Sequence, residues 1–286
     1  MAGDHRAAAN AAFIGAILFV VSALLYIDAY AIDQNARDNA PGGMAAYKTL
    51  NITNLQAHWA GRRDAQLPFV LAETAGAIAW FSLMIPVQSL VALFAQRSAT
   101  FIVIACFTAV AIITLINLTF QLGTLSVTDW ISNWPLLMDA EAHSHDGGFG
   151  PLQALEISYL VGQSRWIWLF AMDMLLLSIG WSAVTFLIFS ARRELEKPPH
   201  LAFAFLSFVG AVVSFAGVFL DISRVLPSFD WVKMNYAAAV ATTLVYMFIL
   251  PIWLVWLGML LRQRSETIPY NSNLATPQFD VEMTNG

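Results

Sequence analysis

The chain has 286 residues, of which 58% are hydrophobic and 12% are charged, and its formal net charge is −5. The charged share is about half of the ~25% found in soluble domains, which excludes an ordinary soluble domain and indicates a polytopic membrane protein. A negative net charge without any basic block argues against a nucleic-acid partner. The single cysteine, Cys106, excludes an internal disulfide.

Six apolar stretches are long enough to cross a bilayer, which takes ~20 residues each. Backbone groups cannot stay unpaired in hydrocarbon, so each stretch is expected to be a helix, and the alternation of a membrane β-barrel is absent. The predicted fold is an all-α membrane bundle in residues 1–264, followed by a disordered polar tail at 265–286. The six predicted helices are residues 11–30, 69–94, 100–122, 166–190, 201–222 and 236–261.

The first apolar stretch has two interpretations. It is followed by Ala29-Tyr30-Ala31, a small-x-small triplet typical of a signal-peptidase site, so residues 1–31 are either a cleaved signal peptide or a retained helix. The head of the chain is only weakly basic and carries Asp4, which favours the retained helix. Both interpretations leave the downstream helices unchanged.

The distribution of basic residues predicts the orientation. A six-helix bundle places seven Lys and Arg on each side, but the clusters "ARRELEKPP" and "LRQRS" adjoin helix ends on the side of the termini. Because basic residues close to helix ends carry the most weight, we expect both termini in the cytosol, in a plasma membrane or an endomembrane. The glycosylation triplet at Asn51 then lies outside, although the same kind of triplet at Asn117 falls inside a predicted helix.

Two long loops on the outer side carry helical patterns of their own. Residues 44–59 place Met, Tyr, Ile, Leu and Trp broadly on one helical face, and "PLQALEISYLV" begins with Pro151, which suits the first turn of a helix. Both segments are predicted to be short amphipathic helices at the extracytoplasmic membrane surface.

Asp173 interrupts the apolar run "LFAMDMLLLSIGW". An aspartate at the middle of a membrane helix costs ~2.5–3.5 kcal/mol on insertion scales, and each Leu or Phe around it offsets ~0.5 kcal/mol. The helix can therefore insert, but the cost of burying Asp173 calls for a functional or structural explanation. Either it belongs to an ion, proton or substrate path, or it makes an interhelical hydrogen bond worth only ~0.6–2 kcal/mol.

Other polar residues fall at a comparable depth in the outer halves of the helices. Glu73 lies near the start of helix 69–94, which begins on the outer side. Asn117 and Gln121 lie one turn apart in helix 100–122. With Asp173 they predict an outward-facing acidic pocket that binds a small cationic or protonatable solute. Glu73 alone also fits an interfacial partner for Arg62 or Arg63. Charged residues also lie at the starts or ends of predicted helices, where a charge near the lipid headgroups has a low free-energy cost. They are predicted to be interfacial: Asp28, Asp221, Arg224 and Lys233.

The loop "DAEAHSHDGGFG" alternates Glu141, His143, His145 and Asp146. Imidazole and carboxylate are good ligands for a divalent transition metal, so 141–146 is a candidate metal site. A closed site needs further ligands, and the alternative is a solvated acidic loop. No organic cofactor is expected, because no histidine for haem ligation and no lysine for a retinal Schiff base lies inside a predicted helix.

Ser207, Gly210, Ser214 and Gly217 place a small residue every three or four positions along helix 201–222. Such a face allows close helix packing, either within the bundle or against a partner helix or a second copy of the chain.

Three functions remain open at this stage. The first is transport or sensing of a small cationic solute, with Glu73 and Asp173 carrying the charge and Asn117 and Gln121 orienting the solute. The second is a non-catalytic membrane organiser that binds proteins through its outer loops and helix 201–222. The third is an intramembrane enzyme that uses Glu73 and Asp173 as acid and base, since no nucleophile elbow, zinc-protease motif or phosphate-binding loop is present.

Overall fold

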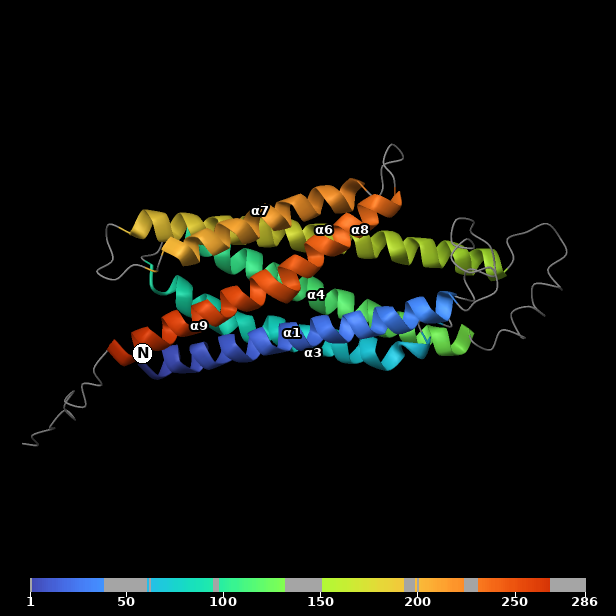
Figure 1. Cartoon of the computed structure of the whole chain (residues 1–286), viewed down its shortest axis with the longest axis horizontal. Helices are drawn as coiled ribbons and strands as arrows, with labels where there is room; N and C mark the ends of the chain where they lie inside the picture. The colour runs from blue at the N-terminus through green and yellow to red at the C-terminus, as the bar shows by residue number, and fades with distance from the viewer. Residues whose placement is uncertain are drawn as a thin grey trace, which may run out of the picture.

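The computed structural model describes residues 2–38, 61, 63–94, 98–131, 151–192, 199, 201–223 and 231–267. The regular elements of this part of the chain are helices that run along one common direction (Figure 1). They are α1 (Ala2–Asp38), α3 (Gln66–Val91), α4 (Ser98–Ile131), α6 (Pro151–Ala191), α7 (Leu201–Ser223), α8 (Trp231–Thr243), the π-helix η2 (Leu244–Ile249) and α9 (Leu250–Thr267).

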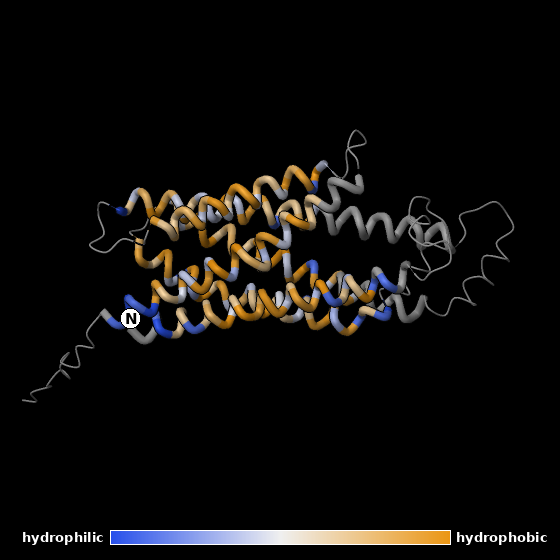
Figure 2. Tube along the Cα trace, in the orientation of Figure 1, coloured by the Kyte–Doolittle hydropathy of each residue, from blue (hydrophilic) through white to orange (hydrophobic). Residues whose placement is uncertain are grey.

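Six helices in the described ranges are long and apolar enough to cross a membrane, which confirms the predicted all-α membrane protein. Figure 2 shows the apolar residues along the middle of the bundle and polar residues near its ends. The spans are His5–Asp33, Gln66–Val91, Ser98–Phe120, Trp168–Ala191, Leu201–Ser223 and Ala237–Glu266. Each overlaps a predicted helix, because apolar run length is the property that both the bilayer and the prediction use.

The helices form two packed pairs joined by the remaining elements. α1 packs along α3, and α6 packs along α7, on opposite sides of the bundle in Figure 1. α4 contacts both α3 and α6, and α9 packs mainly on α1 and also contacts α3 and α7. The N-terminus and the end of α9 lie at the same end of the bundle. α1 contributes buried residues such as Ala12 and Phe19 to the interior, while cleavage after Ala31 stays a prediction.

Several helices extend beyond the predicted apolar stretches. α6 begins at Pro151 as expected, but it continues without interruption to Ala191. The segment predicted to be a separate surface helix is therefore the first part of a 41-residue helix, because no proline follows Pro151 to break it. α9 likewise continues to Thr267. The predicted helix at 44–59 and the tail after 267 lie outside the described residues.

Trp253 on α9 is the centre of the core and is fully buried. Its ring stacks on Phe107 of α4 and on Phe203 of α7, at centroid distances of 5.7 and 5.4 Å, and meets Trp181 of α6 at 6.4 Å. Its indole N–H donates a hydrogen bond to Ser207 Oγ at 2.8 Å. One side chain thus ties four helices together, and its polar atom is satisfied, as burial requires.

The small-residue face of α7 packs against this chain's own helices. A Cβ at Gly210 would lie 2.6 Å from the ring of Trp181, and one at Gly217 would lie 3.5 Å from Met174. Ser207 and Ser214 on the same face are fully buried. The close packing predicted for this face is found within the bundle, and an oligomer formed through it stays a prediction.

The outer surface of the bundle is apolar. Large hydrophobic side chains on every spanning helix are exposed, among them Ile17, Leu67, Phe101, Phe186, Phe205 and Ile252. A soluble protein would not present so continuous an apolar surface. These side chains face lipid, and the lipid bilayer is the environment that the fold requires.

Substituting Gly210 with Ala tests the α6–α7 contact. The added methyl collides with the Trp181 ring, and overpacking of this kind costs about 1–3 kcal/mol. We expect a lower free energy of unfolding for Gly210→Ala, measured by denaturant titration in detergent. The matched control is Gly123→Ala, where a Cβ meets nothing within 4 Å and the better helix propensity is expected to raise stability slightly. Equal stability of the two variants would contradict the contact.

Candidate functional site

Asp173 lies on α6 near one end of the span Trp168–Ala191. Its side chain is 5% exposed, and its Oδ1 atom has no hydrogen-bond partner among the residues that the structure describes. The following residue, Met174, is fully buried against α7. A buried carboxyl group without a partner is destabilising, so Asp173 is not explained as a packing residue.

The π-helix η2 lies opposite this carboxyl. Leu250 N–H donates to Val245 O, five residues back, which is the hydrogen bond that defines a π-helix. The next residue, Pro251, has no N–H to donate and its ring disfavours the normal i−4 contact, so a wider turn before the proline is the expected relief. The wide turn directly before Pro251 is where the proline acts on this helix.

Tyr246 lies inside this wide turn. Its hydroxyl is within electrostatic range of the carboxyl groups of Asp173 on α6 and Asp221 on α7. Its ring meets Trp80 of α3 edge-on, with centroids 6.2 Å apart and planes at 77°. Tyr246 therefore joins the α3 side of the bundle to the α6–α7 side. We call Asp173, Asp221 and Tyr246 the acid–tyrosine cluster.

Asp221 corrects the sequence interpretation. It was predicted to be an interfacial charge, yet it is 1% exposed. One turn earlier on α7, a Cβ added at Gly217 would make ordinary van der Waals contacts with Met174 of α6 and Ala241 of α8, at 3.5 and 3.9 Å. α6 and α8 thus pack on α7 one turn from Asp221, and the end of an apolar run in the sequence does not show such neighbours. Asp28, predicted in the same way, is exposed.

Glu73 belongs to a second group of contacts on the α1–α3 side. It is 4% exposed and accepts a hydrogen bond from the Tyr26 hydroxyl of α1 through Oε1. Ser22 of α1 donates to Ala72 O at 2.7 Å next to it. The Tyr26 ring lies edge-on to Phe69 at a centroid distance of 6.2 Å. Glu73 is thus held by α1.

The Glu73–Arg pairing considered from sequence does not account for these contacts. Arg63 lies 3.5 Å from Asp64, and both side chains are about half exposed. An exposed pair of this kind contributes ~0–1 kcal/mol. Residue 62 lies outside the described ranges.

A single pocket formed by the four predicted residues stays a prediction. Glu73 lies on α3 and Asp173 on α6, two helices on opposite sides of the bundle in Figure 1. Asn117 is 8% exposed on α4, the helix that contacts both α3 and α6, and Gln121 follows one turn later on the same helix. Asn117 and Gln121 therefore lie on the helix between the two acids.

Two predicted sites cannot be placed. Glu141, His143 and His145 of the candidate metal loop lie outside the described residues, as does Asn51 of the glycosylation triplet. Within the described ranges, no group of three or more His, Cys, Asp or Glu side chains forms a metal-binding arrangement.

Sequence reasoning missed Tyr246, Tyr26 and the burial of Asp221. Neither tyrosine was singled out from the sequence. A usable signal was present for Tyr246, a hydroxyl five residues before a proline in the otherwise apolar run "LVYMFILP". For Tyr26 the partner on another helix is the only signal, and sequence spacing does not contain it.

Comparison with known proteins gives no assignment: no family model, no curated protein and no solved structure matches the chain. The function therefore has to be argued from the site itself.

The two acids predict opposite effects on stability. Replacing Asp173 with Leu, which has a similar branched shape, removes a buried carboxyl without a described partner and is expected to stabilise the protein by about 1–3 kcal/mol. Replacing Glu73 with Met leaves the Tyr26 hydroxyl without its acceptor and is expected to destabilise the protein by a similar amount. Denaturant titration in detergent measures both variants. A destabilised Asp173→Leu would show that this carboxyl makes a stabilising contact.

Proposed function

We propose that this multi-pass membrane protein transports or senses a small cationic or protonatable solute. In this proposal the solute enters from the side opposite the termini and binds at the acid–tyrosine cluster. Asp173 supplies the main charge, Asp221 the second charge, and the Tyr246 hydroxyl a neutral oxygen. Glu73 is a second acidic position, on the α1–α3 side.

The observation that carries the proposal is the buried Oδ1 atom of Asp173 without a hydrogen-bond partner in the described part of the chain. Carboxyl groups inside membrane helices are costly, and they usually face a path for an ion, a proton or a substrate. An acid retained only for packing is expected to donate or accept a hydrogen bond from a neighbouring helix. The free atom fits a ligand position better than a packing position.

The neighbours of Asp173 support a cation as the ligand. Asp221 places a second carboxyl group around the same hydroxyl of Tyr246. Two negative charges near each other repel unless a cation or a shared proton lies between them. Carboxylate and hydroxyl oxygens can also bind a metal cation, and they accept hydrogen bonds from an ammonium group. A site built of these groups favours positive charge.

The π-helix supports a binding site in which one side chain, Tyr246, can move. Wide turns of this kind are rare and occur frequently at functional sites. A proline inside the span, at Pro251, leaves one backbone carbonyl without its usual donor, which lowers the cost of bending there. Bending at η2 would move Tyr246 relative to Asp173 and Asp221, which is the motion that opening of a binding site needs.

Asn117 and Gln121 complete the proposal as orienting residues. Both belong to α4, which contacts α3, the helix of Glu73, and α6, the helix of Asp173. Amide side chains accept and donate hydrogen bonds without adding charge, so they suit a passage between two acidic positions.

The orientation with both termini in the cytosol is part of this proposal. At the terminal end of the bundle Arg6, Arg192 and Arg262 are exposed. Basic residues close to helix ends are the ones to which the positive-inside rule gives the most weight.

The two alternatives have less support. An enzyme that uses Glu73 and Asp173 needs both carboxyl groups at one substrate, and their described contacts fall in two groups. An organiser that binds partners through the small residues of α7 needs that face to be available, and Gly210 and Gly217 are covered by Trp181 and Met174.

Asp173→Asn tests the proposal. The substitution keeps the size and removes the charge, so binding of a cation should weaken by about tenfold or more, equivalent to ~1.4 kcal/mol. The measurement is flux into liposomes containing the purified protein, with a pH-sensitive dye for protons and a panel of Na⁺, K⁺ and choline for other cations.

The matched control is Asp28→Asn, which removes an exposed acid near the same end of the bundle and should leave flux unchanged. A wild type that moves none of these cations, or an Asp173→Asn variant that moves them as the wild type does, contradicts the proposal. Loss of a cellular phenotype on deletion of the outer loops, with Asp173→Asn normal, favours the organiser.

A further inference from the structure

A pocket opens at the terminal end of the bundle, away from the acid–tyrosine cluster. It has a volume of about 710 Å³ and lies between the end of α6, the start of α7 and the second half of α9. Its lining includes Arg192, Leu201, Ala202, Trp256, Met259 and Leu260. Because the spans of α6 and α7 end at Ala191 and begin at Leu201, the pocket lies at the boundary between hydrocarbon and water.

The walls of the pocket continue into the lipid-facing surface. Met259 is 45% exposed and Leu201 is 43% exposed. On α9, Met259 follows the exposed Ile252 and Val255 along one face, and on α7, Leu201 precedes the exposed Phe205. The pocket walls formed by Trp256 and Leu260 are apolar, and among the described lining residues Gln263 is the uncharged polar one. An acyl chain lying on the bundle can therefore enter the pocket without leaving an apolar surface.

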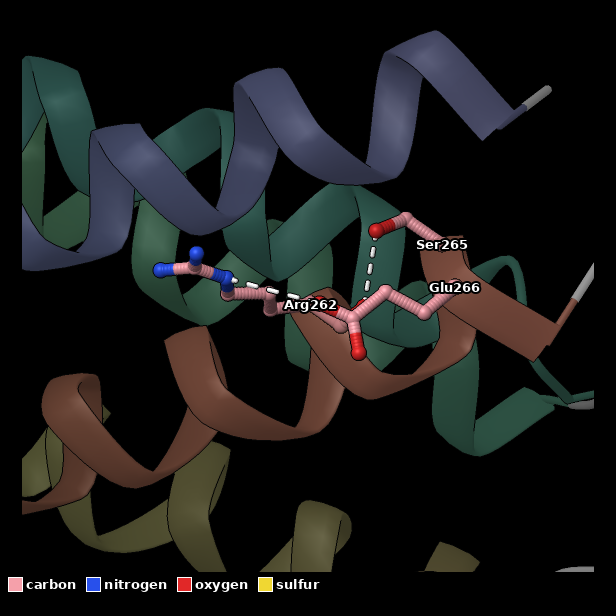
Figure 3. A network of polar contacts seen from close by, with 3 residues as sticks. All are labelled: Arg262, Ser265 and Glu266. Atoms are coloured by element: carbon pink, nitrogen blue, oxygen red, sulfur yellow. Dashed lines mark hydrogen bonds and ion pairs between the residues drawn. The ribbon is translucent and has the colours of Figure 1, made fainter.

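The charged residue among the described lining of the pocket is positive. Arg192 directly follows α6, is exposed and lines the pocket. The first turn of α7, which also lines the pocket, contains no acidic residue. Arg262 lies at the same end, but its guanidinium is 3.7 Å from Glu266 Oε1 (Figure 3), and it does not line the pocket. Of the described arginines, Arg192 is thus the one that lines the pocket.

We propose that this pocket binds one phospholipid with an anionic headgroup. The lipid phosphate lies against the guanidinium of Arg192, which has the fork of donors that phosphate geometry favours. One acyl chain lies along Trp256, Met259 and Leu260. Basic pockets between helices at the cytosolic membrane surface are suited to such headgroups, and this proposal is independent of the solute proposed above.

Native mass spectrometry of the full-length protein tests the proposal. The protein is released from detergent micelles containing equal amounts of phosphatidylglycerol and phosphatidylcholine, and bound lipid is counted. We expect one retained phosphatidylglycerol on the wild type. Arg192→Gln should weaken its retention about tenfold, equivalent to ~1.4 kcal/mol.

Two further variants distinguish lipid binding in the pocket from attraction of the lipid to surface charge in general. Ala202→Phe fills the pocket and keeps Arg192, and it should also lose the lipid. Arg262→Gln removes an exposed arginine at the same end outside the pocket and should retain it. Because Arg192, Ala202 and Arg262 are all exposed, none of these substitutions is expected to unfold the bundle.

Three results would overturn the proposal. One is equal retention of phosphatidylcholine and phosphatidylglycerol by the wild type. Another is equal loss of lipid in Arg262→Gln and Arg192→Gln, which would reflect net charge alone. The third is displacement of the lipid by glycerol phosphate at a similar concentration, which would identify a site for a soluble phosphate.

Discussion

The packing of Trp253 is the interaction on which the rest of the bundle depends. Its ring contacts α4, α6 and α7, and its N–H is satisfied by Ser207. Hydrophobic driving force between helices is weak inside lipid, so close packing and interhelical hydrogen bonds must hold a membrane bundle together. A buried Trp that does both fixes the rotation of α9 about its axis, and with it the position of every element that leads into α9.

The acid–tyrosine cluster follows from that anchor. Trp253 fixes the helix just after Pro251, and the wide turn η2 lies just before the proline. Tyr246, in this turn, lies edge-on to the Trp80 ring and within electrostatic range of Asp173 and Asp221. The Oδ1 atom of Asp173 has no hydrogen-bond partner in the described part of the chain, and that is the reason to look for a ligand there.

The spans could be predicted from sequence because a single physical quantity, the length of an apolar run, determines them. The helix ends could not, because α4 and α6 continue as helix beyond the hydrocarbon, where hydropathy carries no information. Asp173 stood out as a charge in an apolar run. Tyr246 did not, because a tyrosine is compatible with both lipid and water.

The burial of Asp221 and the pairing of Glu73 with Tyr26 could not be predicted from the sequence either. Both depend on which helices become neighbours, and helix order in the chain does not give that. Sequence placed Glu73 and Asp173 at a similar depth and from that inferred one pocket. Depth is a one-dimensional property, so it does not show whether the side chains on α3 and α6 come together.

Access of water to position 173 tests the central claim most directly. In a Cys106→Ala background, Asp173→Cys is treated with a membrane-impermeant thiol reagent added from the side opposite the termini. Asp28→Cys, at an exposed position near that end, is the positive control. Ile112→Cys, 53% exposed on the lipid-facing side of α4, is the negative control. The account predicts labelling at 173 that is slower than at 28 and absent at 112. Protection of position 173, with position 28 labelled, would mean that the carboxyl lies in a dry helix contact, and would contradict a binding site for a solute.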